Sequence, residues 1–491
     1  MYEPKSEFNF LIYNKRRSKI KKSTCLRCQF FSQIEVNIKE KNMSAQKNKQ
    51  IDMLNGPLLK KILIFALPLA ASSILQQLFN SADVAVVGRF AGSKSLAAVG
   101  GNTPVISLLI NLFVGLSVGA NVVIGNYIGQ GKKEKVKEAV HTVMAMAVIC
   151  GVFLLIIGTV LARPILMAIN TPDEVLPLAM LYLRIYFVGM PFVMVYNFGA
   201  AVLRSIGDTK RPLYALIVSG IINICLNLVL VIVFKLDVAG VAIATVIADC
   251  VSASLVTYFL MTGDEMVRFN PKKMSLKKEQ VIKIIKIGAP AGLQGVVFSV
   301  SNVCIQSAIN GFGTKAIAGS SAALNYEYFT YYVINAFNQT TVTFTSQNYG
   351  AKKLERCKKA FRLCLVWGMA ITGIMSVIFV LFKEFFAGVY TADSQAVDYA
   401  VIRMVHVLLL EFLTGTYEIS GGAMRGMGYS LVPALLTVVG CCGFRVAWLY
   451  TVFKICPTFS MLMNVYPATW VITGTLVMGA YLIIRKRVSD K

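Results

Sequence analysis

The stretch ILIFALPLAASSILQQLFNSADVAVVG, residues 62–88, decides the fold. As an α-helix it is long and apolar enough to cross a bilayer, for which about 20 residues suffice. It also carries Pro68 near its start and an acid, Asp83, near its end, which a simple membrane anchor would avoid. We therefore interpret it as the first membrane helix of a protein that uses polar chemistry inside the bilayer.

A polar series runs through this stretch. Ser72, Gln76, Asn80 and Asp83 follow one another at spacings of 4, 4 and 3, which places all four on one side of a helix. A carboxylate in a membrane helix normally faces a water-filled cavity or a partner, so Asp83 is a candidate functional residue. The alternative is that Asp83 lies at the membrane surface, just beyond the hydrocarbon.

The composition indicates a polytopic membrane protein. Of 491 residues, 56% are hydrophobic and only 15% are charged, against roughly 25% charged in a typical soluble domain. Mean hydropathy is +0.65. The net charge of +25 comes from basic residues clustered in short segments between apolar runs, which is typical of cytoplasmic loops. The expected partner is therefore a lipid bilayer and not a nucleic acid.

Zinc-protease and nucleotide-binding motifs are absent from the sequence. It holds two histidines and no HExxH or Walker A pattern. We expect a protein that is not an enzyme and has no cofactor, with no metal beyond a possible Na⁺. Uphill transport by such a chain must be driven by an ion gradient.

Twelve apolar segments follow a basic, polar segment, residues 1–52. We expect residues 1–52 to be a disordered cytoplasmic tail; the alternative is that translation starts at Met43 or Met53. The apolar segments are 62–87, 96–124, 139–161, 178–201, 212–234, 239–261, 283–310, 317–346, 360–382, 398–422, 431–453 and 467–485. Alternate loops are rich in Lys and Arg, which predicts twelve membrane helices with both termini in the cytoplasm.

The two halves of the chain repeat each other. KIGAP at 286–290 resembles IFALP at 64–68, and other matched positions lie 221 residues apart, such as Gly129 and Gly350. Six helices in each half start on the same side of the membrane. The sequence thus predicts an all-α protein with two six-helix lobes related by a pseudo-two-fold axis along the membrane normal. The lobes are 53–262 and 283–491, joined by a cytoplasmic linker, 263–282.

Two further polar stripes lie in the fifth and sixth helices. They are Ser219, Asn223 and Asn227 in the fifth, and Thr245, Asp249 and Ser252 in the sixth. If these stripes converge with Asp83, they form an oxygen-lined cavity that suits Na⁺. A poorly solvated carboxylate would favour its neutral form, so the same site could instead carry a proton. The alternative is that the amides only bond helices together.

The second half lacks this chemistry at the matching positions. Asp83 corresponds to a position near Ile305, and with an offset of 221 Asn223 and Asn227 correspond to Phe444 and Trp448. The ion chemistry is therefore expected mainly in the first half. The second half has its own polar stripe of Asn302, Gln306 and Asn310.

A substrate cavity is expected between the lobes near the middle of the membrane. Glu327 lies within the aromatic run NYEYFTYY, and aromatic faces beside an acid suit an organic cation. The alternative is an aromatic belt at the membrane surface. The candidate cavity residues are Gln76, Asn80, Asn302, Gln306, Glu327, Tyr417 and Glu418.

From about Met53 onward, the chain resembles the multidrug and toxic compound extrusion (MATE) family. The matching pieces recur in order in both halves and include 66–92, LRSIGDTKRP (203–212), SQNYGAKK (346–353) and AMRGMG (423–428). The resemblance implies two lobes that form a V and alternate between outward-open and inward-open states. It also implies efflux of cationic, amphipathic compounds against an inward flow of Na⁺ or H⁺.

The family's site residues map unevenly onto this chain. The acid of the first helix falls on Asp83, the proline that helps to bend that helix on Pro68, and the polar residues of the fifth and sixth helices on Asn223 and Thr245. Where the family usually has a second acid, this chain has Asn227. Asp249 stands where an uncharged residue is more usual, so it either restores the second charge or faces a partner. The seventh-helix acid of one family branch falls near Phe298 and is absent.

Together these observations predict a monomeric antiporter in a bacterial plasma membrane, which exports small organic cations. The alternative is a flippase for a lipid-linked oligosaccharide, from a related branch of the superfamily. Such a flippase would have an arginine-rich cavity, for which the candidates here are Arg184, Arg403 and Arg445.

Overall fold

The structure is a computed structural model that describes residues 51–168, 171–391 and 393–490. The predicted tail lies outside these residues except for Ile51 and Asp52. Both of these belong to the compact unit that begins at Ile51, and Asp52 accepts hydrogen bonds from the backbone amides of Leu54 and Asn55. Ile51 and Asp52 therefore belong with the residues that follow them.

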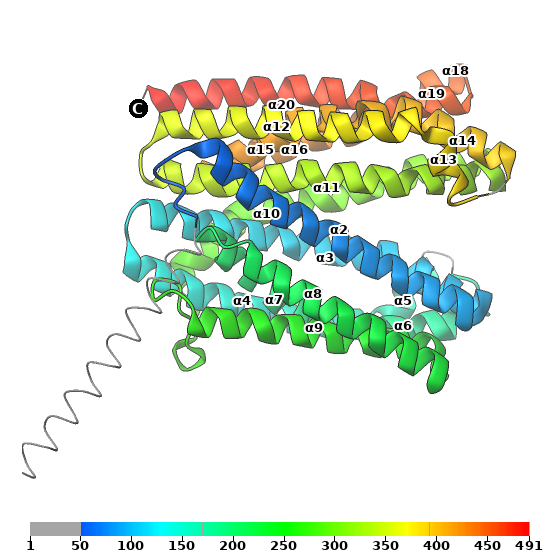
Figure 1. The fold of residues 1–491 in the computed structure, drawn as a ribbon, viewed down its shortest axis with the longest axis horizontal. Coiled ribbons are helices and arrows are strands. Elements are labelled where there is room, and N and C mark those ends of the chain that lie inside the picture. The colour runs from blue at the N-terminus through cyan, green and yellow to red at the C-terminus, as the bar shows by residue number, and fades with distance from the viewer. Residues whose placement is uncertain (1–50, 169–170, 392, 491) are drawn as a thin grey trace, which may run out of the picture. The chain divides into compact units, whose positions relative to one another are not determined.

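Helices form the first half of this unit (Figure 1). They are α2 (Leu58–Phe90), α3 (Gly92–Gly129), α4 (Lys133–Val160), α5 (Ala162–Ala168), α6 (Leu176–Val188), α7 (Met190–Ser205), α8 (Lys210–Asn227), the π-helical turn η1 (Leu228–Val233) and α9 (Asp237–Thr262). We refer to the bundle of these helices as the N-lobe.

A linker with one short helix, η2 (Pro271–Lys273), leads to the second bundle, the C-lobe. Its helices are α10 (Lys278–Asn310), α11 (Thr314–Gly350), α12 (Leu354–Leu381), α13 (Lys383–Gly388), α14 (Ser394–His406), η3 (Leu408–Leu413), α15 (Thr414–Gly426), α16 (Leu431–Thr437), the π-helical η4 (Val438–Gly443), α17 (Phe444–Tyr450), α18 (Val452–Ile455), α19 (Phe459–Met463) and α20 (Val465–Ser489).

Ten of the twelve predicted crossings are apolar. Within the described ranges, nine helices are long and apolar enough to cross a membrane, and α6 with α7, bent by 46°, make a tenth. The other two predicted crossings are α11 and the run of α14, η3 and α15. Helix α11 has 37 residues, about 55 Å at 1.5 Å per residue. It carries many buried polar side chains because it packs against α12, α14 and α15.

The first helix of each lobe begins in the core of the other lobe. Phe65, Ala66 and Leu69 at the start of α2 pack into the core of the C-lobe, whereas Val87 near its end lies in the core of the N-lobe. Helix α10 does the reverse, since Ile284 near its start lies in the N-lobe core. In Figure 1, α2 accordingly runs obliquely from beside α12 toward α8. This exchange was not predicted, because the sequence assigned α2 wholly to the first lobe.

Prolines stand inside both exchanged helices. Pro68 lies in α2 and Pro290 at the corresponding place in α10. Proline has no backbone N–H and its ring crowds the preceding turn, so it weakens the helix at that point. Each helix is therefore easiest to bend within the part that packs against the other lobe.

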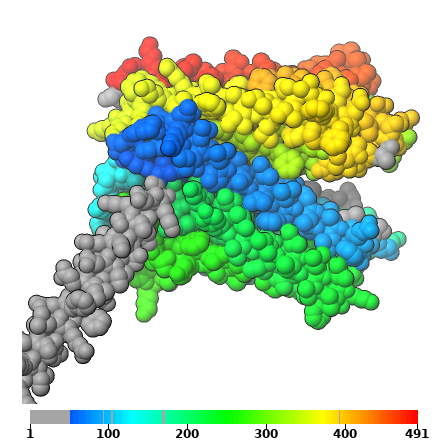
Figure 2. Space-filling view, in the orientation of Figure 1, coloured from blue at the N-terminus to red at the C-terminus, as the bar shows by residue number. Residues whose placement is uncertain are grey.

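The lobes touch closely near the end that carries the Lys- and Arg-rich loops, which we call the basic end. There α3 and α10 cross at glycines: a Cβ added at Gly115 would lie 2.2 Å from the backbone nitrogen of Gly292, and one at Gly119 would lie 2.4 Å from the carbonyl oxygen of Ile284. Toward the opposite end, the surface is hollowed between α2 and the C-lobe (Figure 2). The hollow marks a cleft between the lobes.

An N-terminal strap, residues 51–57, lies across the basic end. Arg356 donates hydrogen bonds to the backbone oxygens of Met53, Asn55 and Gly56, and Lys353 donates to that of Leu54. Met53 is only 1% exposed and packs in the C-lobe core. The strap therefore fixes the start of α2 to the C-lobe.

We expect Gly292→Ala to destabilise the protein, because its Cβ would lie 2.2 Å from the carbonyl oxygen of Leu112 on the other lobe. Overpacking of this kind typically removes about 1–3 kcal/mol of stability, which thermal unfolding of the purified protein would detect. The control is Gly479→Ala in α20, where the added Cβ has no neighbour within 4 Å and should not lower the unfolding midpoint. Equal midpoints for the two variants would contradict the close crossing.

Candidate functional site

Asp83 lies in a cluster of polar side chains from three helices. Its carboxylate accepts hydrogen bonds from the Asn227 amide of α8, at 2.5 Å, and from the Thr245 hydroxyl of α9, at 3.4 Å. Asn223 joins the cluster, accepting from Asn227 at 3.2 Å and donating to Thr245 at 3.4 Å. The structure thus brings together four of the five residues that the sequence suggested for cation binding.

Helical periodicity explains why these side chains meet. Asn223 and Asn227 are one turn apart on α8, and that helix packs against both α2 and α9. Asp83 is only 8% exposed. Among the described residues no Lys, Arg or His forms an ion pair with it, so only neutral donors stabilise its charge.

Asp249, the fifth candidate, stands apart from the cluster. It is one turn from Thr245 on α9, but its carboxylate approaches the break between α6 and α7, where a Cβ on Gly189 would lie 3.6 Å from Oδ2. It is partly exposed. Asp249 is therefore a second acid near Asp83 that is not hydrogen-bonded to it.

The predicted cavity residues separate into two groups. Gln76, Asn80 and Asn302 are exposed and Gln306 is half-buried, as a polar cleft requires. On α10, Gly288, Gly292 and Ser299 face α3 of the other lobe, and Ser299 accepts a 3.5 Å hydrogen bond from Asn111.

Asn302 and Gln306 continue the same face of α10 by steps of three and four residues. They stand beyond the close contact with α3 and so face the cleft between the lobes.

Glu327, Tyr417 and Glu418 lie inside the C-lobe instead. Glu327 accepts two hydrogen bonds from Arg403 of α14, at 2.6 and 2.8 Å, in an ion pair whose side chains are 8% and 3% exposed. Glu418 accepts from the amide of Asn338 at 2.8 Å, and Tyr417 packs in the lobe core. These three residues do not line an exposed wall, so the sequence-based assignment of them to a cavity is not supported.

The structural role of the buried Arg403 was not predicted from the sequence. Arg403 was considered only as a possible flippase residue, yet it neutralises Glu327 and also donates to Ser320 at 2.6 Å. Glu411 of η3 accepts at 2.6 Å from Thr330, which lies one turn after Glu327 on α11. The helix-face spacing of Glu327 and Thr330 was visible in the sequence, but their partners are 76 and 81 residues away.

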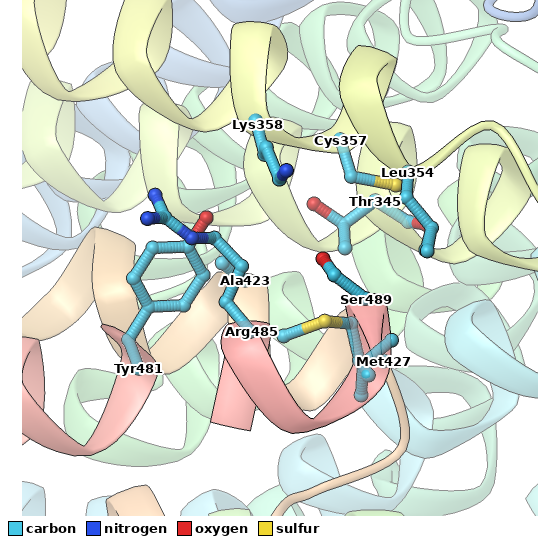
Figure 3. A pocket seen from close by; sticks show the side chains of 10 residues that line it. Thr345, Leu354, Cys357, Lys358, Ala423, Met427, Tyr481, Arg485 and Ser489 are labelled. Carbon is cyan, nitrogen blue, oxygen red and sulfur yellow. The ribbon is translucent and has the colours of Figure 1, made fainter. Parts of the chain in front are cut away.

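A pocket at the basic end of the C-lobe is too small for an organic substrate. It lies among α11, α12, α15 and α20, with Lys358 and Arg485 at its rim (Figure 3). Its volume of about 10 Å³ matches a single water molecule. The polar cleft between the lobes is therefore the better candidate for binding a transported compound.

Two polar-lined lobes with exchanged first helices, and a buried carboxylate held by neutral side chains from two other helices, are features of secondary membrane transporters. Within that class the chain belongs to the MatE family, whose model matches residues 68–229 and 290–451, one match in each lobe. The repeat, the two lobes and the membrane helices predicted from the sequence are thereby confirmed.

Curated relatives cover most of the chain. The probable multidrug resistance protein YoeA of Bacillus subtilis is 26% identical over 434 residues, covering 86% of this chain and 93% of the relative. The probable multidrug resistance protein NorM of Thermotoga maritima is 24% identical over 387 residues, covering 77% and 82%. A solved multidrug resistance MATE transporter in an outward-facing conformation shares the fold, with a TM-score of 0.82 at 23% identity and coverage of 90% and 98%.

Removing one partner of the Glu327–Arg403 pair should strongly destabilise the C-lobe. Arg403→Met leaves a buried carboxylate without a counter-charge, which typically costs about 3–5 kcal/mol. The double variant Glu327→Gln/Arg403→Met should lose much less than the sum of the single losses, measured by thermal unfolding. Lys94→Met, which breaks an ion pair exposed by 65% and 74%, should leave the midpoint unchanged. Additive losses in the double variant would rule out the pairing.

Proposed function

We propose that the protein exports cationic or amphipathic organic compounds in exchange for Na⁺ or H⁺. The observation that carries this proposal is the buried Asp83 carboxylate, held by the neutral side chains of Asn227 and Thr245. An unpaired acid inside a membrane protein is costly to keep charged, so its cost is best explained by a cation that binds and leaves during the transport cycle. The names of the curated relatives support drug efflux as the purpose of the exchange.

The donors around Asp83 suit a small hard cation. Asn227 uses its amide nitrogen to bond Asp83 and Asn223, and its own Oδ1 is buried without a partner. Together with a carboxylate oxygen and the Thr245 hydroxyl, this Oδ1 would complete an oxygen cluster of the kind Na⁺ prefers. A proton on Asp83 would instead turn the carboxyl into a donor, for which the same Oδ1 is an acceptor.

The course of α2 connects the ion to the conformational change. One half of α2 carries Asp83 in the N-lobe, the other half packs in the C-lobe, and Pro68 lies within the half that packs in the C-lobe. Neutralising Asp83 changes the hydrogen bonds that hold the Asp83-containing half of α2 to α8 and α9. Bending at Pro68 would then shift one lobe against the other and change the access to the cleft.

The basic end is assigned to the cytoplasm, because Lys- and Arg-rich loops are retained on that side. Both termini then lie in the cytoplasm, and the cleft opens to the outside of a bacterial plasma membrane. With this orientation the close crossing of α3 and α10 seals the inner side. A single chain carries the complete Asp83 cluster and both walls of the cleft, so a monomer suffices for the cycle.

The flippase alternative is weakened by the arginines. Arg403 is neutralised by Glu327 inside the C-lobe, and Arg184 lies on an exposed face of α6, in a hollow of about 450 Å³ that it shares with Arg163. Of these three candidates, Arg445 is the one hydrogen-bonded to Asn302, which faces the cleft. An arginine-rich cavity of the kind that a flippase would need is therefore not supported.

We expect Asp83→Asn to abolish gradient-driven efflux of ethidium from membrane vesicles, because the neutral amide can neither bind the cation nor release a proton. Transport would be measured with imposed Na⁺ and H⁺ gradients in turn, and the gradient that drives the wild-type protein identifies the coupling ion. Asp173→Asn, which changes an exposed acid, is the control and should transport normally. Full efflux by Asp83→Asn at normal abundance would refute the proposal.

A further inference from the structure

Arg445 carries a positive charge deep in the C-lobe without an acidic partner. The residue is 1% exposed, and in the part of the chain that the structure describes no carboxylate forms an ion pair with it. Its guanidinium lies between two aromatic rings, 4.8 Å from the centroid of Phe298 and 4.7 Å from that of Tyr466. The rings attract the cation but do not neutralise it. A charge kept in this way inside a membrane protein indicates a function.

One hydrogen bond connects Arg445 to a residue that faces the cleft. Nη1 of Arg445 donates to Oδ1 of Asn302 at 2.8 Å. Asn302 is exposed and continues the face of α10 that is turned toward the other lobe. Because Arg445 holds the amide oxygen, the two N–H donors of the Asn302 amide are left for whatever occupies the cleft.

The position of Arg445 in the fold reinforces this interpretation. The two matches to the family model begin 222 residues apart, at 68 and 290, and end 222 residues apart, at 229 and 451. With that offset Asn80 corresponds to Asn302, and Asn223 falls on Arg445 at the end of the match; with the offset of 221 that separates Gly129 from Gly350 it falls on the neighbouring residue. The offset of 221, inferred from the sequence at this point, had paired Asn223 with Phe444 instead.

The two lobes thus carry opposite charges at related places. In the N-lobe, the first, fifth and sixth helices surround the acid Asp83. In the C-lobe, the equivalent helices contribute Asn302 from α10, Arg445 from α17 and Tyr466 from α20. The acidic cluster is buried in the N-lobe, whereas the positive charge of Arg445 reaches the cleft through Asn302.

We propose that Asn302, positioned by Arg445, binds an anionic group, such as a carboxylate, of an amphoteric substrate. The proposal rests on the proposed efflux function and narrows its substrates to compounds that carry an acidic group in addition to a cationic, apolar body. Asn302 donates the hydrogen bonds to the anionic group. Arg445 acts as a positioning residue that orients the amide and supplies the positive charge behind it.

Two dyes that differ at one group test this proposal. Rhodamine 110 carries a free carboxyl group, and rhodamine 123 is its methyl ester with the same cationic ring system. Binding to the purified protein is measured by fluorescence polarisation, and export is measured in membrane vesicles. Asn302→Ala should weaken the binding of rhodamine 110 about tenfold and change that of rhodamine 123 less than twofold.

Further variants separate positioning from folding. Asn302→Asp places a carboxylate against Arg445 and should lose rhodamine 110 while keeping rhodamine 123. Arg445→Gln should imitate Asn302→Ala, and Arg445→Lys, which keeps a cationic donor, should recover part of the preference. The control Gln395→Ala removes an exposed amide whose oxygen accepts from Lys315 at 2.7 Å, and it should leave both dyes unaffected.

The outcomes are distinct from those for the efflux function. An equal loss of both dyes in Asn302→Ala would indicate a structural role and overturn the proposal. Unchanged binding of rhodamine 110, or no binding of it by the wild-type protein, would overturn it as well. Failure of the wild-type protein to export rhodamine 123 would count against efflux itself, while the binding comparison would still decide the role of Asn302.

Discussion

Asp83 is a carboxylate that neutral side chains alone hold inside a membrane protein, and much of the structure follows from accommodating it. A charge of this kind needs donors from more than one helix. Asn227 and Thr245 supply them from α8 and α9, so the second half of α2 is fixed in the N-lobe. By contrast, Glu327 in the C-lobe has a full counter-charge in Arg403, which makes it a rigid support and not an ion-exchange group.

The exchange of helix halves connects the hydrogen bonds of Asp83 to both lobes. Since α2 begins in the C-lobe core and ends in the N-lobe core, any change in the bonds of Asp83 acts on a helix that both lobes hold. The strap of residues 51–57 fixes one end of α2 through Arg356. Pro68 then lies between two anchored segments, where bending meets the least resistance. The helix-weakening proline and the buried acid are thus parts of one helix.

Local periodicity explains what the sequence could predict. The spacing of Asn223, Asn227 and Asp83 showed which faces they share, and the structure brings those faces together. The pairing of Glu327 with Arg403 could not be predicted, because it depends on how α11 packs against α14. Hydropathy alone would also have missed α11, a crossing rich in buried polar residues; the repeat and the alternating basic loops supported it.

The register of the repeat had a larger effect on the comparison of the two lobes than any other detail of the sequence. An offset of 221 makes Phe444 the counterpart of Asn223, and an offset of 222 makes it Arg445, so a shift of one residue decides whether the comparison points to a charge in the second lobe. A repeat that evolves from one bundle starts with the same groups in both halves, so opposite charges at related positions require separate explanations. Asp83 needs a cation to exchange, whereas Arg445 has aromatic neighbours and one amide that faces the cleft. An anionic group on the transported compound would supply the counter-charge that the protein itself does not provide.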